Sequence, residues 1–242
     1  MQKKSQFIAG LRIVIADDEP FNLSLVAGMV RDFGCTNIIL ASSGVQAVLA
    51  ISNISNPPNV LIVDFNMPDV NGLQILRMIR CGEADVTRDL RVLMLTGSSD
   101  FNLVGAAMAL DVDAFLVKPV SKATLSSRLE KLVNPPGDIK SVQEYAKIDI
   151  DAISRTLQSR QPVGTPRPRT EQRGTPSGVK LGFDALVEGM YLGEDIYGPA
   201  GELLLPKNTR LSDRLIRRMR ELRGILQIDS MYVTKAEEAK KA

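Results

Sequence analysis

The chain has 242 residues, a length that favours two modest domains over one. Its composition, 44% hydrophobic and 24% charged, excludes a disordered, collagen-like or coiled-coil chain. It contains no histidine, which excludes histidine metal sites, Ser-His-Asp and Cys-His catalysis, histidine phosphorelay donors and phosphohydrolases built on a His-Asp metal site. The net charge of +2 gives no argument for nucleic acid, and the two cysteines, Cys35 and Cys81, are too few for a disulfide framework.

No stretch of the chain approaches the roughly 18 consecutive apolar residues of a membrane span. The segment Met1 to Gly10 has a basic start but lacks the apolar stretch of a signal peptide. We therefore expect a cytoplasmic protein without membrane insertion.

Short apolar runs typical of strands alternate with helical periodicity through residues 8–133. This alternation predicts an α/β domain, a doubly wound five-stranded parallel sheet covered by helices on both faces. The expected strands are Arg12–Ala16, Asn37–Leu40, Val60–Val63, Arg91–Leu95 and Ala114–Val117, and the expected helices lie near Phe21–Phe33, Gly44–Ile54, Gly72–Arg80, Phe101–Ala109 and Lys122–Leu132.

A connecting segment follows at residues 134–160. Pro135-Pro136 ends the preceding helix, because proline lacks an amide donor and clashes inside a helix. Apolar residues three and four apart over Asp138–Arg160 then predict one amphipathic helix. We prefer a solvated or docked helix to a dimeric coiled coil, since Asp149 interrupts the heptad. Residues 161–178 contain four Pro and three Gly, which predicts a flexible linker without fixed structure.

Residues 179–235 predict a small α+β module. Strand patterns cover Val179–Phe183, the run through Tyr191, Glu202–Leu205 and Met231–Thr234, and helical periodicity covers Leu211–Arg223. At this size independent stability is marginal, so we expect docking on the first domain or on a partner.

Carboxylates stand at the ends of two expected strands. Asp17 and Asp18 directly follow the first strand and Asp64 ends the third, so all three project from the carboxyl edge of the sheet, where ligands bind. Because three carboxylates in one pocket repel one another, we expect a hard divalent cation with oxygen ligands, Mg²⁺, at this edge. Thr96 follows the fourth strand and Lys118 the fifth. A hydroxyl, an ammonium group and a metal together suit a transferred phosphoryl group.

In these positions the chain resembles the receiver domain of the response regulators of bacterial two-component systems, whose fold is flavodoxin-like. The resemblance covers the amino-terminal half of the chain. It rests on Asp17-Asp18 after the first strand, Asp64 followed by Asn66-Met67-Pro68 and Gly72, Thr96 with Gly97, and Lys118-Pro119.

The resemblance implies roles for the acidic residues. It identifies Asp64 as the nucleophile that takes a phosphoryl group from a partner sensor histidine kinase or phosphotransfer protein. It identifies Asp17, Asp18 and Asp64 as Mg²⁺ ligands, together with the carbonyl of Asn66.

The resemblance also implies roles around the last strand. Thr96 and Lys118 contact the phosphoryl oxygens, and the Lys118-Pro119 bond is cis. Thr96 and Phe115 are the switch residues, Phe115 being the aromatic that turns inward. A packing role for Phe115 alone stays open, because any strand interior favours an aromatic residue.

The alternative from another class is an enzyme, a Mg²⁺-dependent phosphatase with an aspartate nucleophile, similar to haloacid dehalogenase folds. That chemistry uses a second aspartate two residues after the nucleophile as a general acid. Here that residue is Asn66, which cannot donate a proton in this role. We therefore expect a switch that holds phosphate and has no enzymatic turnover.

The carboxy-terminal module is similar to a small β-rich module found beside His-Asp phosphodiesterase domains. The matching residues are Leu186, Gly189-Met190, Asp195-Ile196, Gly201 and Leu203–Leu205. No function transfers with this resemblance, and the absence of histidine excludes the phosphodiesterase itself.

Five arginines crowd the expected helix of this module: Arg214, Arg217, Arg218, Arg220 and Arg223. The first three are expected on the face opposite Leu215 and Met219, as a nucleic-acid surface, an acidic-partner surface or simply a solvated face. Because no complete helix-turn-helix pattern accompanies them, we favour an interaction module with an unknown downstream protein partner over a DNA-binding transcriptional regulator.

Overall fold

The chain is described by a computed structural model over residues 8–53, 55–97, 101–132, 139–148, 150, 175–197, 203–226 and 228–234. The chain divides into two compact units, Met1–Ser99 with Val112–Ala146 and Asp100–Asp111 with Lys147–Ala242. We call the first the sheet unit and the second the carboxy-terminal unit. Among the described helices, none combines the length and the hydrophobicity that crossing a bilayer requires.

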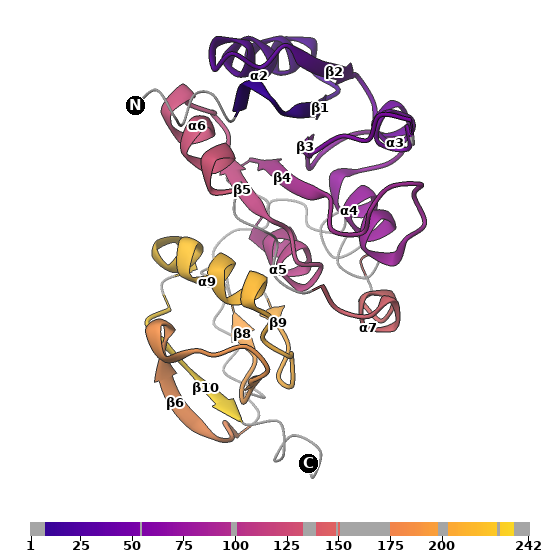
Figure 1. The fold of residues 1–242 in the computed structure, drawn as a ribbon. Coiled ribbons are helices and arrows are strands. Elements are labelled where there is room, and N and C mark those ends of the chain that lie inside the picture. The colour runs from indigo at the N-terminus through magenta and orange to yellow at the C-terminus, as the bar shows by residue number, and fades with distance from the viewer. Residues whose placement is uncertain are drawn as a thin grey trace, which may run out of the picture. The chain divides into compact units, whose positions relative to one another are not determined.

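The sheet unit is built on five parallel strands (Figure 1). Their order in the sheet is β2-β1-β3-β4-β5, so the chain runs outward from β1 in both directions. This order confirms the doubly wound parallel sheet that the sequence predicts. The strands are β1 (Arg12–Ala16), β2 (Asn37–Ala41), β3 (Val60–Asp64), β4 (Arg91–Thr96) and β5 (Ala114–Val117).

Helices pack on the sheet because its central strands are apolar on both faces. Ile13 and Ile15 of β1 belong to one buried cluster with Val26 of helix α2 and Leu125 of helix α6, so these two helices cover one face. The helices α3 and α4 lie on the other side of the sheet in Figure 1. The helices of this unit are α2 (Pro20–Asp32), α3 (Gly44–Ile51), α4 (Gly72–Cys81), α6 (Lys122–Lys131) and the short α7 (Val142–Ala146).

Side-chain caps fix the first residues of three of these helices. Ser43 accepts a hydrogen bond from an amide in the first turn of α3, and Ser121 does the same for α6. Asn71 and Gln74 form a reciprocal capping box at α4, with both N···O distances at 2.9 Å. These caps place the loops that join strands to helices at the carboxyl edge of the sheet.

The segment after α6 differs from the single helix expected over residues 138–160. Helix α7 packs on α4, whereas Lys147 and Ile148 are not helical, and residues 151–160 lie outside the described residues. Tyr145 is fully buried, and its hydroxyl oxygen accepts a hydrogen bond from the Lys140 amide at 3.1 Å. The Arg88 guanidinium donates to the Lys140 carbonyl at 2.7 Å. These contacts hold the segment against the sheet unit and favour the docked interpretation.

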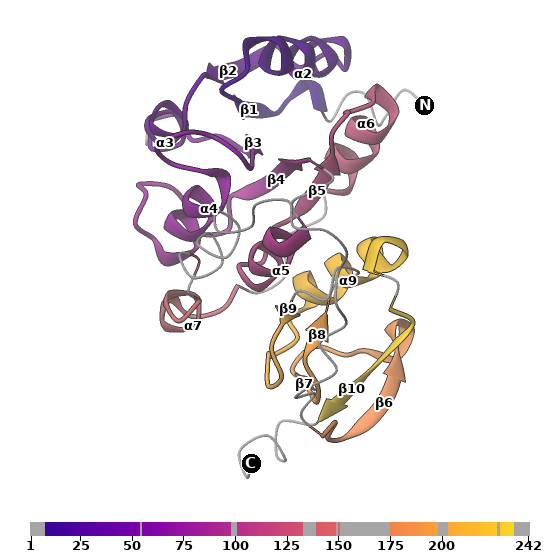
Figure 2. The same ribbon diagram turned by 180° about the vertical axis from the view of Figure 1, so that it is seen from behind.

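The carboxy-terminal unit contains antiparallel strands and the helix α9 (Figure 2). One sheet has the order β6-β10-β7, and β8 pairs with β9 in a second sheet. The first strand ends one residue earlier than expected, because the buried Phe183 starts a 3-10 turn. The described elements of this unit after residue 174 are β6 (Val179–Gly182), η1 (Phe183–Ala185), β7 (Tyr191–Leu192), β8 (Ile196–Tyr197), β9 (Leu203–Leu205), α9 (Asp213–Leu226) and β10 (Ser230–Thr234).

The linker expected at residues 161–178 lies largely outside the described residues. Its last four residues, Thr175–Gly178, are described and make specific hydrogen bonds. The Ser177 amide donates to the Gly193 carbonyl at 2.9 Å, and the Lys207 ammonium donates to the Thr175 carbonyl at 3.1 Å. Residues just before β6 are therefore hydrogen-bonded to the rest of the carboxy-terminal unit.

Helix α5 (Phe101–Ala109) belongs to the carboxy-terminal unit, although it lies between β4 and β5 in the sequence and was expected within the domain at 8–133. It packs against β9 and α9. A Cβ added to Gly105 would lie 2.6 Å from the Leu204 Cα of β9, which is closer than real side chains approach. Glycine at 105 therefore allows the backbones of α5 and β9 to pack closely.

We expect Gly105→Ala to loosen the carboxy-terminal unit, although alanine favours a helix over glycine by about 1 kcal/mol. The added methyl group forces β9 away from α5, so amide hydrogen exchange of the full chain should be faster in β9 than in the wild type. Gly28→Ala in α2 is the matched control, because a Cβ there meets no atom within 4 Å. It should raise the thermal unfolding midpoint. Unchanged exchange of β9 in Gly105→Ala would contradict this packing.

Candidate functional site

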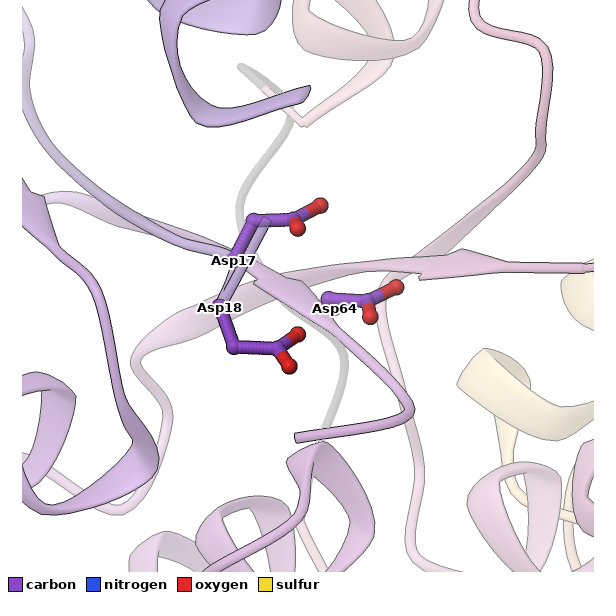
Figure 3. A group of neighbouring side chains, drawn as sticks. All are labelled: Asp17, Asp18 and Asp64. Atoms are coloured by element: carbon purple, nitrogen blue, oxygen red, sulfur yellow. The ribbon is translucent and has the colours of Figure 1, made fainter. Parts of the chain in front are cut away.

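Three aspartates meet at the carboxyl edge of the central strands. Ala16, the last residue of β1, pairs with Val63 of β3. Asp17 and Asp64, which follow these two residues in the chain, are therefore neighbours. Asp17, Asp18 and Asp64 each offer a carboxylate oxygen, and these oxygens lie within 4.8 Å of one another. Figure 3 shows the three carboxyl groups turned to the same side. The structure therefore brings together the three carboxylates that the strand ends predict.

One lysine joins two of these carboxylates. The Lys118 ammonium lies 2.7 Å from an Asp64 oxygen and 2.9 Å from an Asp17 oxygen. The other Asp17 oxygen accepts a hydrogen bond from the Glu19 amide at 3.0 Å. Lys118 directly follows β5, and the peptide bond to Pro119 is cis, which confirms the conformation implied by the receiver resemblance.

Burial dominates the electrostatics of Asp64, which is only 5% exposed. Loss of hydration raises the pKa of Asp64 to about 6, against the opposing effect of the Lys118 ammonium, and the nearby Asp17 carboxylate raises it further. Burial by itself lowers the pKa of Lys118, but its hydrogen bonds to Asp64 and Asp17 outweigh this effect and raise that pKa. Negative charge at Asp64 is thus costly, and an additional cation would lower that cost.

The carboxylates line an open pocket of about 540 Å³. Asn66, expected as a metal ligand, is exposed and contributes to the pocket wall. Sequence reasoning missed two polar residues of this wall, Glu19 and Asn22, whose side chains hydrogen-bond each other at 2.9 Å. Both residues closely follow the Asp17-Asp18 pair in the sequence, and this proximity could have identified them as part of the site. The lining residues are Asp17, Asp18, Glu19, Pro20, Asn22, Asp64, Asn66, Gly97 and Lys118.

The two expected switch residues lie apart from this wall. Thr96, at the end of β4, is 4% exposed, and its hydroxyl donates to the Gly97 carbonyl at 3.2 Å. Phe115 is buried in β5, in register with Met94 of β4. Thr96 is therefore close along the chain to the lining residue Gly97 but is itself absent from the pocket surface.

Gly72 supports the loop that follows Asp64. A Cβ at position 72 would lie 2.5 Å from the Asp64 carbonyl oxygen, and the Gly72 amide donates to the Phe65 carbonyl at 3.1 Å. Only glycine allows this close approach of the first turn of α4 to the end of β3. The motif residue therefore positions Asp64 sterically.

Comparison with known proteins gives the family. Residues 13–130 match the response regulator receiver domain. The chemotaxis protein CheY of Pseudomonas aeruginosa is 30% identical over 122 residues, which are 50% of this chain and 95% of that protein. The chain belongs to the response regulator receiver family.

Further similar proteins match the same half of the chain. The chemotaxis protein CheY-3 of Vibrio cholerae is 30% identical over 122 residues, covering 50% of this chain and 91% of that protein. A solved receiver domain protein from Clostridium thermocellum is 29% identical, covers 50% of this chain and 93% of that chain, and has a TM-score of 0.46. The receiver assignment therefore concerns the amino-terminal half of the chain.

One of the three arginines expected opposite Leu215 and Met219 is not on an exposed face of α9. Arg214 is 2% exposed and thus buried like the apolar residues of the helix, which makes that expectation wrong for this residue. Arg217 forms an ion pair with Asp213 at 2.9 Å, one helical turn away.

The arginines nearer the end of α9 also have partners within the unit. Arg220 donates to the Phe183 carbonyl at 3.1 Å, and Arg223 forms an ion pair with Asp229 at 2.9 Å. The side chain of Arg218 lies outside the described residues. These internal contacts reduce the charge that α9 can offer to a nucleic acid.

We expect Asp64→Asn to stabilise the chain at pH 8 in metal-free buffer. The unfolded chain releases the Asp64 proton near the ordinary pKa of 3.8, whereas the folded chain retains it to about 6, so the folded state loses stability as the pH rises through this window. Asparagine carries no charge and avoids this loss, which amounts to about 1 to 3 kcal/mol.

Chemical denaturation of both chains at pH 8 and near pH 4 measures this difference. The variant should exceed the wild type in unfolding free energy at pH 8, and the gain should shrink toward pH 4. If the variant and the wild type differ in unfolding free energy by the same amount at both pH values, the burial of an ionised carboxylate is not the cause of that difference.

Proposed function

We propose that this chain is a two-component response regulator in which Asp64 accepts a phosphoryl group from a sensor histidine kinase or a phosphotransfer protein. The observation that carries the proposal is the convergence of Asp17, Asp18, Asp64 and Lys118 at one pocket of a receiver-family sheet. This set contains a nucleophile, oxygen ligands for a cation and a fixed ammonium group. Phosphoryl transfer between an imidazole and a carboxylate requires these three components.

The acidic pocket fits Mg²⁺. Asp17, Asp18 and Asp64 would hold the ion together with the Asn66 carbonyl, since hard cations prefer carboxylate and carbonyl oxygens. One ammonium group among three carboxylates leaves the pocket negative, and burial, which raises the pKa of Asp64 to about 6, adds to the cost of that charge. When bound, Mg²⁺ neutralises charge on the incoming phosphoryl oxygens.

The residues around the pocket have distinct roles in the transfer. A carboxylate oxygen of Asp64 forms a bond to phosphorus while the N–P bond of the donor phosphohistidine breaks, and its electron pair returns to the imidazole. Lys118, already in contact with Asp64, stays within reach of the new phosphoryl oxygens. Thr96 and Phe115 then respond to the added charge, the hydroxyl of Thr96 by donating a hydrogen bond and the ring of Phe115 by repacking.

We propose that the receiver holds its phosphate as a signal without enzymatic turnover of other substrates. Asn66 occupies the position at which an aspartate phosphatase has its general acid, and an amide cannot protonate a leaving group. The carboxy-terminal unit would act as a non-catalytic interaction module for a downstream protein. The ion pairs and burial of its helix arginines favour this output over DNA binding.

Asp18→Ala should weaken Mg²⁺ binding by about tenfold or more while the fold is kept, because Asp18 is exposed and contributes charge rather than packing. Isothermal titration of the full chain measures the affinity, and circular dichroism checks the fold. Asp85→Ala, which removes an exposed carboxylate elsewhere on the sheet unit, is the control and should leave the affinity unchanged. Equal affinities of the Asp18→Ala and wild-type chains would overturn the metal assignment.

Treatment of the full chain with acetyl phosphate and Mg²⁺ should add one phosphoryl group at Asp64. Mass spectrometry after borohydride reduction locates the acyl phosphate, and Asp64→Asn serves as the unreactive control. Modification of a different residue in the wild type, with Asp64 unmodified, would refute the proposed function.

A further inference from the structure

Two buried carboxylates flank the boundary between the compact units in the chain. Asp111 closes the segment that belongs to the carboxy-terminal unit, and Val112 resumes the sheet unit. Asp111 is fully buried and Asp113 is 7% exposed. Asp111 accepts a hydrogen bond from a residue of the carboxy-terminal unit and Asp113 accepts two from residues of the sheet unit, so this short segment connects two anchored points.

Asp113 is anchored in the sheet unit. It accepts a hydrogen bond from the Arg80 guanidinium at 2.8 Å and one from the Val92 amide at 2.9 Å. The Asp113 amide donates to the Val92 carbonyl at 3.0 Å. β5 begins at the next residue and carries Phe115 before reaching Lys118. Asp113 therefore ties the start of β5, the strand that leads to the phosphoryl site, to α4 and β4.

Asp111 is anchored in the carboxy-terminal unit. It accepts a hydrogen bond from the Ser212 hydroxyl at 2.7 Å, and the same hydroxyl oxygen accepts one from the Leu215 amide at 3.1 Å. Ser212 is itself 4% exposed and directly precedes α9. The carboxylate that ends the α5 segment thus orients the side chain that caps the long helix of the module.

We propose that the Asp111–Ser212 hydrogen bond is the contact through which phosphorylation of Asp64 regulates the carboxy-terminal module. This inference rests on the proposed function. The phosphoryl group recruits Thr96 and Lys118. Thr96 ends β4, the strand before α5 in the chain, and Lys118 follows β5, the strand after α5. A changed position of β5 is passed to Asp111 across Val112.

The direction of the effect follows from the geometry of the contact. Its O···O distance of 2.7 Å is already optimal for a hydroxyl donating to a carboxylate, and both groups are buried. A displacement of Asp111 can therefore only weaken the bond. Phosphorylation then frees the Ser212 cap, loosens the first turn of α9 and exposes this end of the module to a downstream partner.

Amide hydrogen exchange of the full chain tests this coupling, with beryllofluoride and Mg²⁺ as the stable phosphoryl mimic. In the wild type, the mimic should accelerate exchange in the first turn of α9 by about tenfold or more, the change expected for loss of one buried hydrogen bond to a charged group. Peptides around Asp17 and Asp64 report in the same experiment whether the mimic has bound.

Substitutions at Asp111 separate the coupling from a structural role. Its backbone has a positive φ of 53°, which glycine and asparagine tolerate. Asp111→Gly removes the carboxylate and should give fast exchange of α9 with or without the mimic. Asp111→Asn keeps an acceptor oxygen and should retain a response to the mimic. Asn208→Gly, the same kind of change at an exposed residue with φ of 66°, should behave as the wild type.

The outcomes distinguish a failure of the coupling from a failure of the proposed function. Protection changes at Asp17 and Asp64 without any in α9 would overturn the coupling and leave the proposed function intact. An undiminished α9 response in a folded Asp111→Gly chain would also overturn it. No response at Asp17 and Asp64 would refute the proposed function, and the coupling with it.

Discussion

The ion pairs of Lys118 with Asp17 and Asp64 are the interaction on which the functional half of this chain depends. A single ammonium group, 2.7 and 2.9 Å from its two partners, is shared by carboxylates that are both nearly inaccessible to water. Two such anions destabilise each other at this depth, and a third, Asp18, lies beside them. The site is thus strained electrostatically, and it is suited to bind ions and groups that relieve the excess charge.

The fold produces this convergence through the register of a parallel sheet. The carboxyl ends of parallel strands all lie at one edge of the sheet. Asp17 after β1, Asp64 at the end of β3 and Lys118 after β5 therefore meet there, although they are far apart in sequence. Gly72 lets α4 begin against the end of β3, and Asn71 and Gln74 cap that helix. The packing of the sheet therefore maintains the geometry of the polar site without any of its polar groups having to stabilise the fold.

Much of the sheet unit could be predicted because its signals are local. Apolar runs and helical periodicity report burial, and the positions of Asp17, Asp64 and Lys118 after predicted strands then place them at one edge. Other features depend on contacts that periodicity does not encode. The burial of Arg214, the break after Ala146 in the connecting helix and the packing of α5 with β9 each require knowledge of a partner distant in sequence.

The position of α5 has a consequence for the organisation of the protein. By sequence this helix is part of the receiver. However, Gly105 packs closely against Leu204, and Asp111, just after the helix, accepts a hydrogen bond from Ser212. Both partners lie more than ninety residues later in the chain, in the same compact unit. The residues that match the receiver domain thus contribute α5 to the carboxy-terminal unit. β4 and β5, the strands before and after α5 in the chain, are therefore linked to this unit by covalent connections.

Fluorine-19 NMR of the full chain with beryllofluoride tests most directly whether the carboxylate cluster and Lys118 form one site for a cation and a phosphoryl group. With Mg²⁺ present we expect resonances of bound beryllofluoride, which disappear on chelation of the metal and are absent in Asp64→Asn. Bound resonances that persist in Asp64→Asn, or that do not depend on Mg²⁺, would contradict the account.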